Sequence, residues 1–358
     1  MHTAIVLDES ISQSSVIDTA QLLTDVRAFA DTIVVSTSES PENYALGMWI
    51  TAPDLMTGLT QAIGHAASKQ VLVVSSSLAF NSTDLSKLVA EIGDIRTLEH
   101  LIVAPTTEVG TINLPEISPE NIIQALSEEC MWPLTCIATT RRALSGVWSE
   151  NIESPNELVL QALIKSIADG DTVRVIESIS PAISLSRAEA TSRLSDAARA
   201  RCLQVAIDGM NIEELFPQHN WAMYSEESAA TAFHTLTALF LRLNQPETAL
   251  ECLVCSEKLE ESPRYFALQG FIHEAQGETL GAVASFVSSL QCYESRKEQN
   301  KAHYLHFTPN NIEVVKTHLE EGLEALNRKD NNTALRSFSD AIYCFDDFYQ
   351  ELGIKKSA

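Results

Sequence analysis

Three consecutive serines, Ser75, Ser76 and Ser77, follow an apolar segment that runs from Gln70 to Val74, and Ser36 follows another apolar segment. Short apolar segments of this kind are typical of β-strands. Open α/β sheets bind ligands at the carboxyl ends of their strands, where these hydroxyls would lie. The serines are therefore candidate contacts to a polar ligand, and ordinary strand-end hydrogen bonding is the alternative.

Other motifs that carry chemistry are scarce in this sequence. Cys252 and Cys255 form a CxxC pair, but no second pair has that spacing, so we expect small core or groove residues and not a zinc site. The sequence contains no G-x-S-x-G, no P-loop and no G-x-G-x-x-G. Hydrolase, nucleoside triphosphatase and dehydrogenase functions therefore lack support.

Short apolar segments alternate with helical periodicity over the first 180 residues. Continuous apolar segments are typical of strands that are buried on both faces of a parallel sheet. We therefore predict an α/β domain with three layers, α/β/α, around a mostly parallel sheet. The predicted strands are 3–7, 32–35, 70–74, 100–104, 134–139 and 172–176, and the predicted helices are 16–30, 54–67, 84–92 and 156–168.

The strand pattern ends near residue 180, so we assign 1–180 to the α/β domain, 181–225 to a helical connector and 226–358 to a helical domain. Three segments of the helical domain share a small residue, a larger apolar residue four positions later and a small residue three positions after that. These triplets are Ala249, Leu253, Ser256; Ala282, Phe286, Ser289; and Ala334, Phe338, Ala341. Gly270 and Gly322 each precede one of these alanines by twelve positions.

This pattern resembles tetratricopeptide (TPR) repeats, which place small residues where two helices cross closely. The resemblance implies an all-α domain of stacked helix pairs that binds a protein or peptide partner through residues 226–358. A purely structural role for these helices, as a cap or a dimerisation region, is the alternative.

The order of elements in the first 180 residues resembles the GT-A fold of family 2 glycosyltransferases. Residues 3–7 and 31–35 correspond to the first two strands of that family, 56–68 to its Gly/Ala-rich helix and 70–74 to the strand that enters its metal motif. Residues 136–148 correspond to a later strand with an Arg-rich turn, and 156–170 to the helix that carries acceptor-side acids. The resemblance implies a domain built to bind a nucleotide sugar.

The sequence departs from that family at three places. The family's Asp-x-Asp motif, which holds a divalent cation, is replaced by Ser75, Ser76 and Ser77, and neutral hydroxyls cannot replace two carboxylates on such a cation. The family's nucleotide-facing Asp is replaced by Ser36, and the acceptor-side acidic pair is reduced to Asn156 and Glu157. The departures imply a domain that kept its fold and lost its chemistry.

An active, metal-independent glycosyltransferase is the alternative that the same resemblance implies. Arg141 or Arg142 would steady the leaving diphosphate, and Glu157 would act as the general base. Ser36, Ser75 and Ser77 would then contact the nucleotide sugar, which would be the substrate without a standard divalent-metal site. The ordinary alternatives are a solvated turn for the arginines and a helix-surface acid for Glu157.

The composition restricts the partners. The chain has 48 Asp and Glu against 24 Lys and Arg, which gives a formal charge of −24 and disfavours nucleic acids and anionic membranes. No apolar run approaches the ~20 residues of a membrane span, and no secretory leader is recognised. The seven cysteines are irregularly spaced. We therefore predict a cytoplasmic protein with reduced thiols and no cofactor. The sequence leaves open whether the protein forms a homo-oligomer.

Our leading hypothesis from the sequence is a non-catalytic glycosyltransferase-like protein. It would act as an interaction or scaffold protein through its TPR-like domain, in surface-glycan or protein glycosylation. A third interpretation sets the resemblance aside and describes a ligand-binding α/β domain with a helical dimerisation region.

Overall fold

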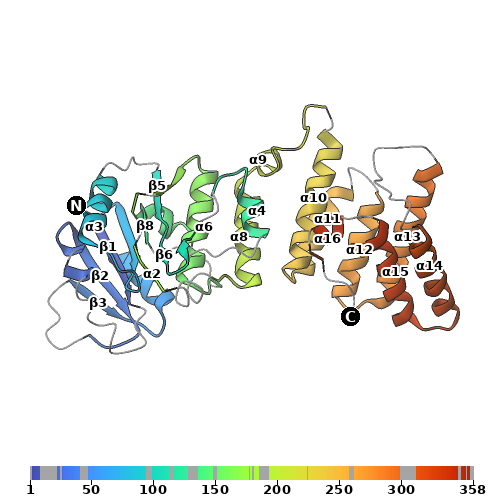
Figure 1. Ribbon diagram of the computed structural model, residues 1–358, viewed down its shortest axis with the longest axis horizontal. Coiled ribbons are helices and arrows are strands. Elements are labelled where there is room, and N and C mark those ends of the chain that lie inside the picture. The colour runs from blue at the N-terminus through green and yellow to red at the C-terminus, as the bar shows by residue number, and fades with distance from the viewer. Residues whose placement is uncertain are drawn as a thin grey trace. The chain divides into compact units, whose positions relative to one another are not determined.

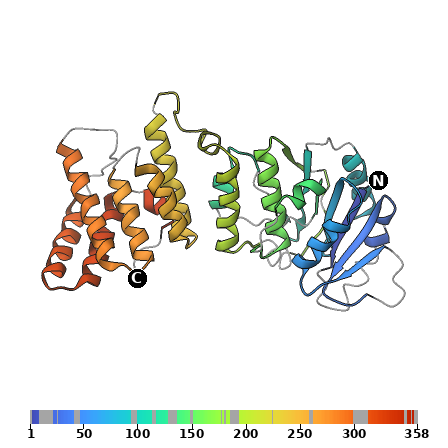
Figure 2. The ribbon, with the colours of Figure 1, turned by 180° about the vertical axis from the view of Figure 1, so that it is seen from behind.

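The apolar segments near the N-terminus pair into a seven-stranded sheet with the order β3-β2-β1-β4-β8-β5-β9 (Figures 1 and 2). Its strands are β1 (His2–Asp8), β2 (Ala30–Ser36), β3 (Met48–Thr51), β4 (Gln70–Ser75), β5 (Glu99–Val103), β8 (Cys136–Thr140) and β9 (Thr172–Ile176). Neighbours pair in parallel except at β8, which runs antiparallel to both β4 and β5. The short strands β6 (Thr106–Thr107) and β7 (Gly110–Thr111) form a separate pair.

Helices cover both faces of this sheet. The described helices of this part of the chain are α2 (Leu55–His65), α3 (Ser82–Gly93), α4 (Ile122–Ser127), α5 (Arg141–Ser145), α6 (Pro155–Ala168), α8 (Asp196–Gly209) and α9 (Ile212–Leu215), of which α8 packs on α6 and α4. Apolar residues of α3 pack with Val34 on one face. Because successive strand residues point to opposite faces, Val35 faces the other side, where α2 packs with Gly58 against it. The predicted three-layer α/β/α architecture with a mostly parallel sheet is confirmed.

This computed structural model describes most, but not all, of the chain. The described residues are 2–8, 22–24, 26–40, 47–93, 99–112, 117–127, 136–147, 151–176, 178–179, 181–184, 193–223, 225–257, 262–298, 312–345, 348–351 and 353–354. The helix predicted over 16–30 is helical at 22–24 and 26–27, and 16–21 lie outside the described residues. Positions 134–135 of the predicted strand 134–139 also lie outside them.

The chain divides into two compact units, Met1–Leu215 and Phe216–Ala358. Helix α8 packs on α6 and so belongs to the first unit, although it falls within the predicted connector 181–225. Within the described ranges, no helix combines the length and the apolar character that crossing a bilayer requires.

The described residues of the second unit form three helical hairpins and a short last helix. They are α10 (Ser225–Arg242) with α11 (Pro246–Glu257), α12 (Pro263–Ala275) with α13 (Thr279–Glu298), α14 (Ile312–Asn327) with α15 (Asn331–Phe345), and α16 (Phe348–Glu351) (Figure 1). Each hairpin turn has one residue with a left-handed backbone, and each lies five positions before a repeat alanine. These residues are Asn244 with φ 56°, Gly277 with φ 77° and Lys329 with φ 60°. The three hairpins therefore share one turn geometry.

Two of the hairpins also share a close helix crossing. A Cβ atom on Gly270 would lie 2.5 Å from the ring of Phe286, and one on Gly322 would lie 2.8 Å from the ring of Phe338. Both phenylalanines are buried, so only glycine leaves room for the ring at these crossings. Two of the three predicted repeat segments therefore share a packing contact.

The hairpins do not stack in the same way throughout the unit. The second hairpin packs on the first through its first helix, α12, which contacts both α10 and α11. The third hairpin packs on the second through its second helix, α15, which contacts α13. Residues 299–311, which separate the second and third hairpins, lie outside the described part of the chain.

A buried histidine makes the stability of the helical unit sensitive to acid. His234 on α10 is 3% exposed, and its Nε2 has no hydrogen-bond partner among the described residues. Burial, with a smaller effect of the Arg264 charge, lowers the pKa of His234 to about 4 from 6.5. Between these two pH values the unfolded chain binds a proton that the folded chain excludes, so stability falls as the pH falls.

We expect this histidine to cost the unit about 2 kcal/mol of unfolding free energy between pH 7 and pH 5. Urea unfolding of the wild type and of His234→Leu at both pH values isolates the contribution of His234. The variant should lose less stability on acidification than the wild type. Equal losses in both proteins would contradict the prediction.

Candidate functional site

The serines predicted to contact a ligand lie together at one edge of the sheet. Parallel pairing places Asp8 opposite Ser36 and Leu7 opposite Ser75, so the carboxyl ends of β1, β2 and β4 meet there. The Ser36 hydroxyl donates to Asp8 Oδ2 at 2.9 Å, and the hydroxyls of Ser75 and Ser77 lie 2.6 Å apart. We call Asp8, Ser36, Ser75 and Ser77 the strand-end group.

Hydrogen bonds within the strand-end group occupy its hydroxyls. Ser36 Oγ also accepts from the backbone N–H of Ser38 at 3.0 Å, and Ser75 Oγ accepts from that of Ser77 at 3.1 Å. Ser36 and Ser75 are each 1% exposed. The serines therefore hold the ends of the strands in place, and a ligand would have to compete with these local bonds.

Asp8 is a strand-end carboxylate that the sequence reasoning passed over. It is 8% exposed and accepts the Ser36 hydroxyl. Its position directly after an apolar strand was the signal that could have identified it. Within the part of the chain that the structure describes, no three His, Cys, Asp or Glu side chains are grouped closely enough to hold a metal ion.

The arginine pair lies at the opposite edge of the sheet. Because β8 is antiparallel to β4, Thr140 pairs with Gln70 and the backbone N–H of Arg141 donates to Lys69 O at 2.7 Å. The length of β4, about 17 Å at the usual rise per residue, separates this edge from Ser75. Ser36, Ser75 and Ser77 therefore do not share one site with Arg141 and Arg142. The interpretation that grouped them is corrected on this point.

Arg141 also has a local structural partner. Its Nη1 donates to Ala66 O at 2.8 Å and its Nη2 to Gly64 O at 3.2 Å. These carbonyls lie at the end of α2, where the last turn of a helix leaves acceptors unsatisfied. Arg141 thus joins the start of α5 to the end of α2.

Glu157 is buried between α6 and α8. Its side chain is 0% exposed, and its carboxylate accepts from the backbone N–H of Glu153 at 2.8 Å and from Gln161 Nε2 at 2.9 Å. Arg201 on α8 donates to it through Nε at 2.6 Å and through Nη2 at 3.0 Å. Hydrogen bonding to Glu157 raises the pKa of Arg201 above its usual range.

Four donors fill the acceptor sites that a carboxylate offers. The geometry therefore makes Glu157 a structural link between α6 and α8. Glu157 was expected to be an acid on the helix surface, and it is instead fully buried.

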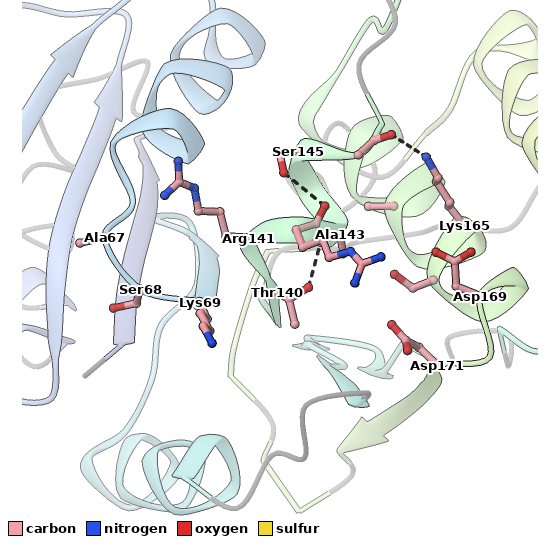
Figure 3. Close-up of a pocket in the computed structure, with 14 residues that line it drawn as sticks. Ala67, Ser68, Lys69, Thr140, Arg141, Ala143, Ser145, Lys165, Asp169 and Asp171 are labelled. Carbon is pink, nitrogen blue, oxygen red and sulfur yellow. Dashed lines mark hydrogen bonds between the residues drawn. The ribbon is translucent and has the colours of Figure 1, made fainter.

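A pocket lies at the edge of the sheet where Arg141 and Arg142 are found (Figure 3). Its volume is about 1040 Å³, and it is formed where β4 begins, β8 ends, α6 ends and β9 begins. Its charged lining residues are Lys69, Arg141, Arg142, Lys165, Asp169 and Asp171. Figure 3 shows Lys69 and Arg141 on one side of it and Lys165, Asp169 and Asp171 on the other. We call it the basic pocket.

A buried histidine positions one acid of the basic pocket. His100, which is 0% exposed, lies between Thr139 and Asp171, with Nδ1 2.8 Å from Thr139 Oγ1 and Nε2 3.1 Å from Asp171 Oδ2. Thr139 is itself buried. The contact fixes the Asp171 carboxylate beside the start of β9.

No protein-family model and no curated protein matches this sequence. Several solved structures are similar in part, at low identity. A 1-349 fragment of S. aureus TarS has a TM-score of 0.42 and 12% identity, with 96% of this chain and 92% of that one covered. The mannosyltransferase PcManGT from Pyrobaculum calidifontis, in complex with GDP-Man and Mn²⁺, has a TM-score of 0.40 and 13% identity, with 80% and 86% covered.

A third similar structure is the glucosyl-3-phosphoglycerate synthase from Mycobacterium tuberculosis, with a TM-score of 0.36 and 11% identity. The similarity covers 51% of this chain and 70% of the synthase. Likenesses of this size do not assign an activity to the chain.

Proposed function

We propose that the chain is a glycosyltransferase-like protein without catalytic activity that acts as an interaction or scaffold protein. The observation that carries the proposal is the separation of the residues that catalysis would need. Ser36, Ser75 and Ser77 lie at one edge of the sheet, and Arg141 and Arg142 lie at the other. Glu157 is enclosed by hydrogen bonds between α6 and α8.

The same separation argues against the alternative of an active, metal-independent glycosyltransferase. In that alternative an arginine must approach the diphosphate that the strand-end group would hold, and a base must reach the acceptor. A general base has to lie within hydrogen-bond reach of the proton that it removes. The four donors around Glu157 leave its carboxylate no free acceptor position for that step.

The proposed interaction surface belongs to the helical unit. Leu250 and Val254 are exposed on α11 and lie four positions apart, so they share one face of the helix. The shared turns and Gly–Phe crossings of the hairpins support a TPR-like arrangement, in which such faces bind a protein or peptide. The link to surface-glycan or protein glycosylation derives from the sequence resemblance of the α/β domain.

Titration of the full chain with UDP-, GDP- and dTDP-sugars, each with and without Mn²⁺, tests the proposal. A ligand at 100 times its Kd would stabilise the folded state by about 2.7 kcal/mol, so binding would raise the melting temperature clearly. We expect no rise at millimolar ligand. A rise with one nucleotide sugar, strengthened by Mn²⁺, would favour the enzyme.

Capture of partner proteins by the full chain tests the proposed interaction surface. Proteins captured by the full chain should be lost with Leu250→Glu/Val254→Glu and retained with Val109→Glu, which changes an exposed apolar residue of the other unit. Retention of all partners by the α11 variant would remove this face from the proposal.

A further inference from the structure

The basic pocket gathers positive charge in a strongly acidic chain. Residues 1–180 contain only eight Lys and Arg, and four of them, Lys69, Arg141, Arg142 and Lys165, line this pocket. The antiparallel pairing of β8 with β4 brings Lys69 beside Arg141 and Arg142, and Lys165 comes from the last turn of α6. This concentration distinguishes the pocket from the rest of a unit that is acidic overall.

Two of these cations are fixed by the fold, and two are available. Arg141 donates to the carbonyls of Ala66 and Gly64, and Lys165 Nζ donates to Gly146 O at 2.8 Å. Each keeps further N–H groups, because a guanidinium has five and an ammonium has three. The side chains of Lys69 and Arg142 have no hydrogen-bond or ion-pair partner among the residues that the structure describes.

The charge of the lining matches a small dianion. Four basic and two acidic side chains give the pocket a formal charge of +2. The buried His100 fixes the position of the Asp171 carboxylate, and Asp169 is the other acid of the lining. A phosphate monoester is a dianion near neutral pH, and guanidinium groups bind its oxygens through paired N–H donors.

We propose that the basic pocket binds a phosphate monoester, with Lys69 and Arg142 as the principal donors and Arg141 and Lys165 as fixed positive charges. The site lies at the opposite edge of the sheet from the strand-end group, so it does not depend on the proposed function. A nucleotide sugar carries the same total charge of −2 but spreads it over two phosphates, whereas a monoester concentrates it on one, so we expect the pocket to prefer the monoester.

Isothermal titration calorimetry of the full chain with inorganic phosphate, and separately with acetate, tests the proposal. We expect saturable phosphate binding that is at least about tenfold weaker in Lys69→Gln/Arg142→Gln, because two charge-assisted hydrogen bonds are lost. Asp169→Asn should bind phosphate more tightly than the wild type. Acetate, a monoanion, should bind more weakly than phosphate.

Arg27→Gln is the matched control, since Arg27 is an exposed cation of the same unit outside the pocket lining. It should leave the phosphate affinity unchanged, and all variants should melt at the wild-type temperature because the changed side chains are exposed. Equal phosphate affinity in the wild type and the Lys69→Gln/Arg142→Gln variant would overturn the site. Equal affinity for acetate and phosphate would overturn the ligand class.

The nucleotide-sugar titration should be repeated in Lys69→Gln/Arg142→Gln. A nucleotide-sugar response that persists in this variant contradicts the proposed function and leaves the basic pocket standing. A response that disappears comes from the pocket and overturns its preference for monoesters.

Discussion

Replacing Arg201 with methionine should lower the unfolding free energy of the α/β unit by about 3 kcal/mol. The change removes the two donors that contact Glu157 at 2.6 and 3.0 Å and keeps much of the volume of the side-chain stem. It leaves a carboxylate that is 0% exposed without its cation. An uncompensated charge in that position is costly because the interior cannot solvate it. Urea unfolding at pH 7 measures the change.

Arg174→Met is the matched control for this prediction. Arg174 is also paired with two glutamates, Glu91 at 3.0 Å and Glu99 at 2.8 Å, but its side chain is 46% exposed. Exposed ion pairs of this kind contribute less than about 1 kcal/mol. A similarly small loss of unfolding free energy in Arg201→Met would show that Glu157 is not a structural link between α6 and α8. Its role as a general base would then have to be reconsidered.

Replacing Phe286 with alanine should destabilise the helical unit by about 3–5 kcal/mol. Phe286 is fully buried, lies over Gly270 and contacts Phe271 edge to face, with ring centroids 4.9 Å apart. Truncation leaves a cavity where α12 and α13 cross. The loss should be visible in thermal and urea unfolding of the full chain.

A double-mutant cycle with Gly270→Ala separates the crossing from ordinary helix propensity. In the wild type, Gly270→Ala forces the added methyl group against the Phe286 ring and should cost about 1–3 kcal/mol. In the Phe286→Ala background the methyl group enters the vacated space, and alanine should stabilise the helix by about 0.5–1 kcal/mol.

Gly64→Ala controls for propensity, since Gly64 is exposed on α2 and its added Cβ would meet no atom within 4 Å. It should be stabilising whether or not Phe286 is present. The same sign for Gly270→Ala in both backgrounds would contradict the close crossing.

The strands and the internal repeat could be read from the sequence because both leave local patterns. A strand buried on both faces must be apolar throughout, and this condition located β1, β2, β4, β5 and β8. The edge strand β3 was missed, because its four residues include only one buried side chain and carry no such pattern. The repeat was visible because a close helix crossing admits only small residues at fixed positions, such as Gly270 and Gly322.

The roles of single charged residues could not be read from the sequence. Glu157 follows the N-cap Ser154 of α6, and that local position is the same for an exposed acid and for a buried one. Only the packing of α8 on α6, which brings Arg201 from 44 positions away, makes it a buried ion pair. Contacts between distant segments have no signature in local spacing.

The sequence by itself determined the chain's acidity, its α/β and helical halves, and the positions of its buried strands and tight crossings. These properties depend on residues close together in the chain and on the burial of apolar surface. Only the tertiary structure decided which polar residues meet. The direction of β8 is the decisive case, because a parallel and an antiparallel strand buried on both faces have the same apolar composition. By running antiparallel, β8 carries Arg141 and Arg142 away from the serines of the strand-end group and into the basic pocket.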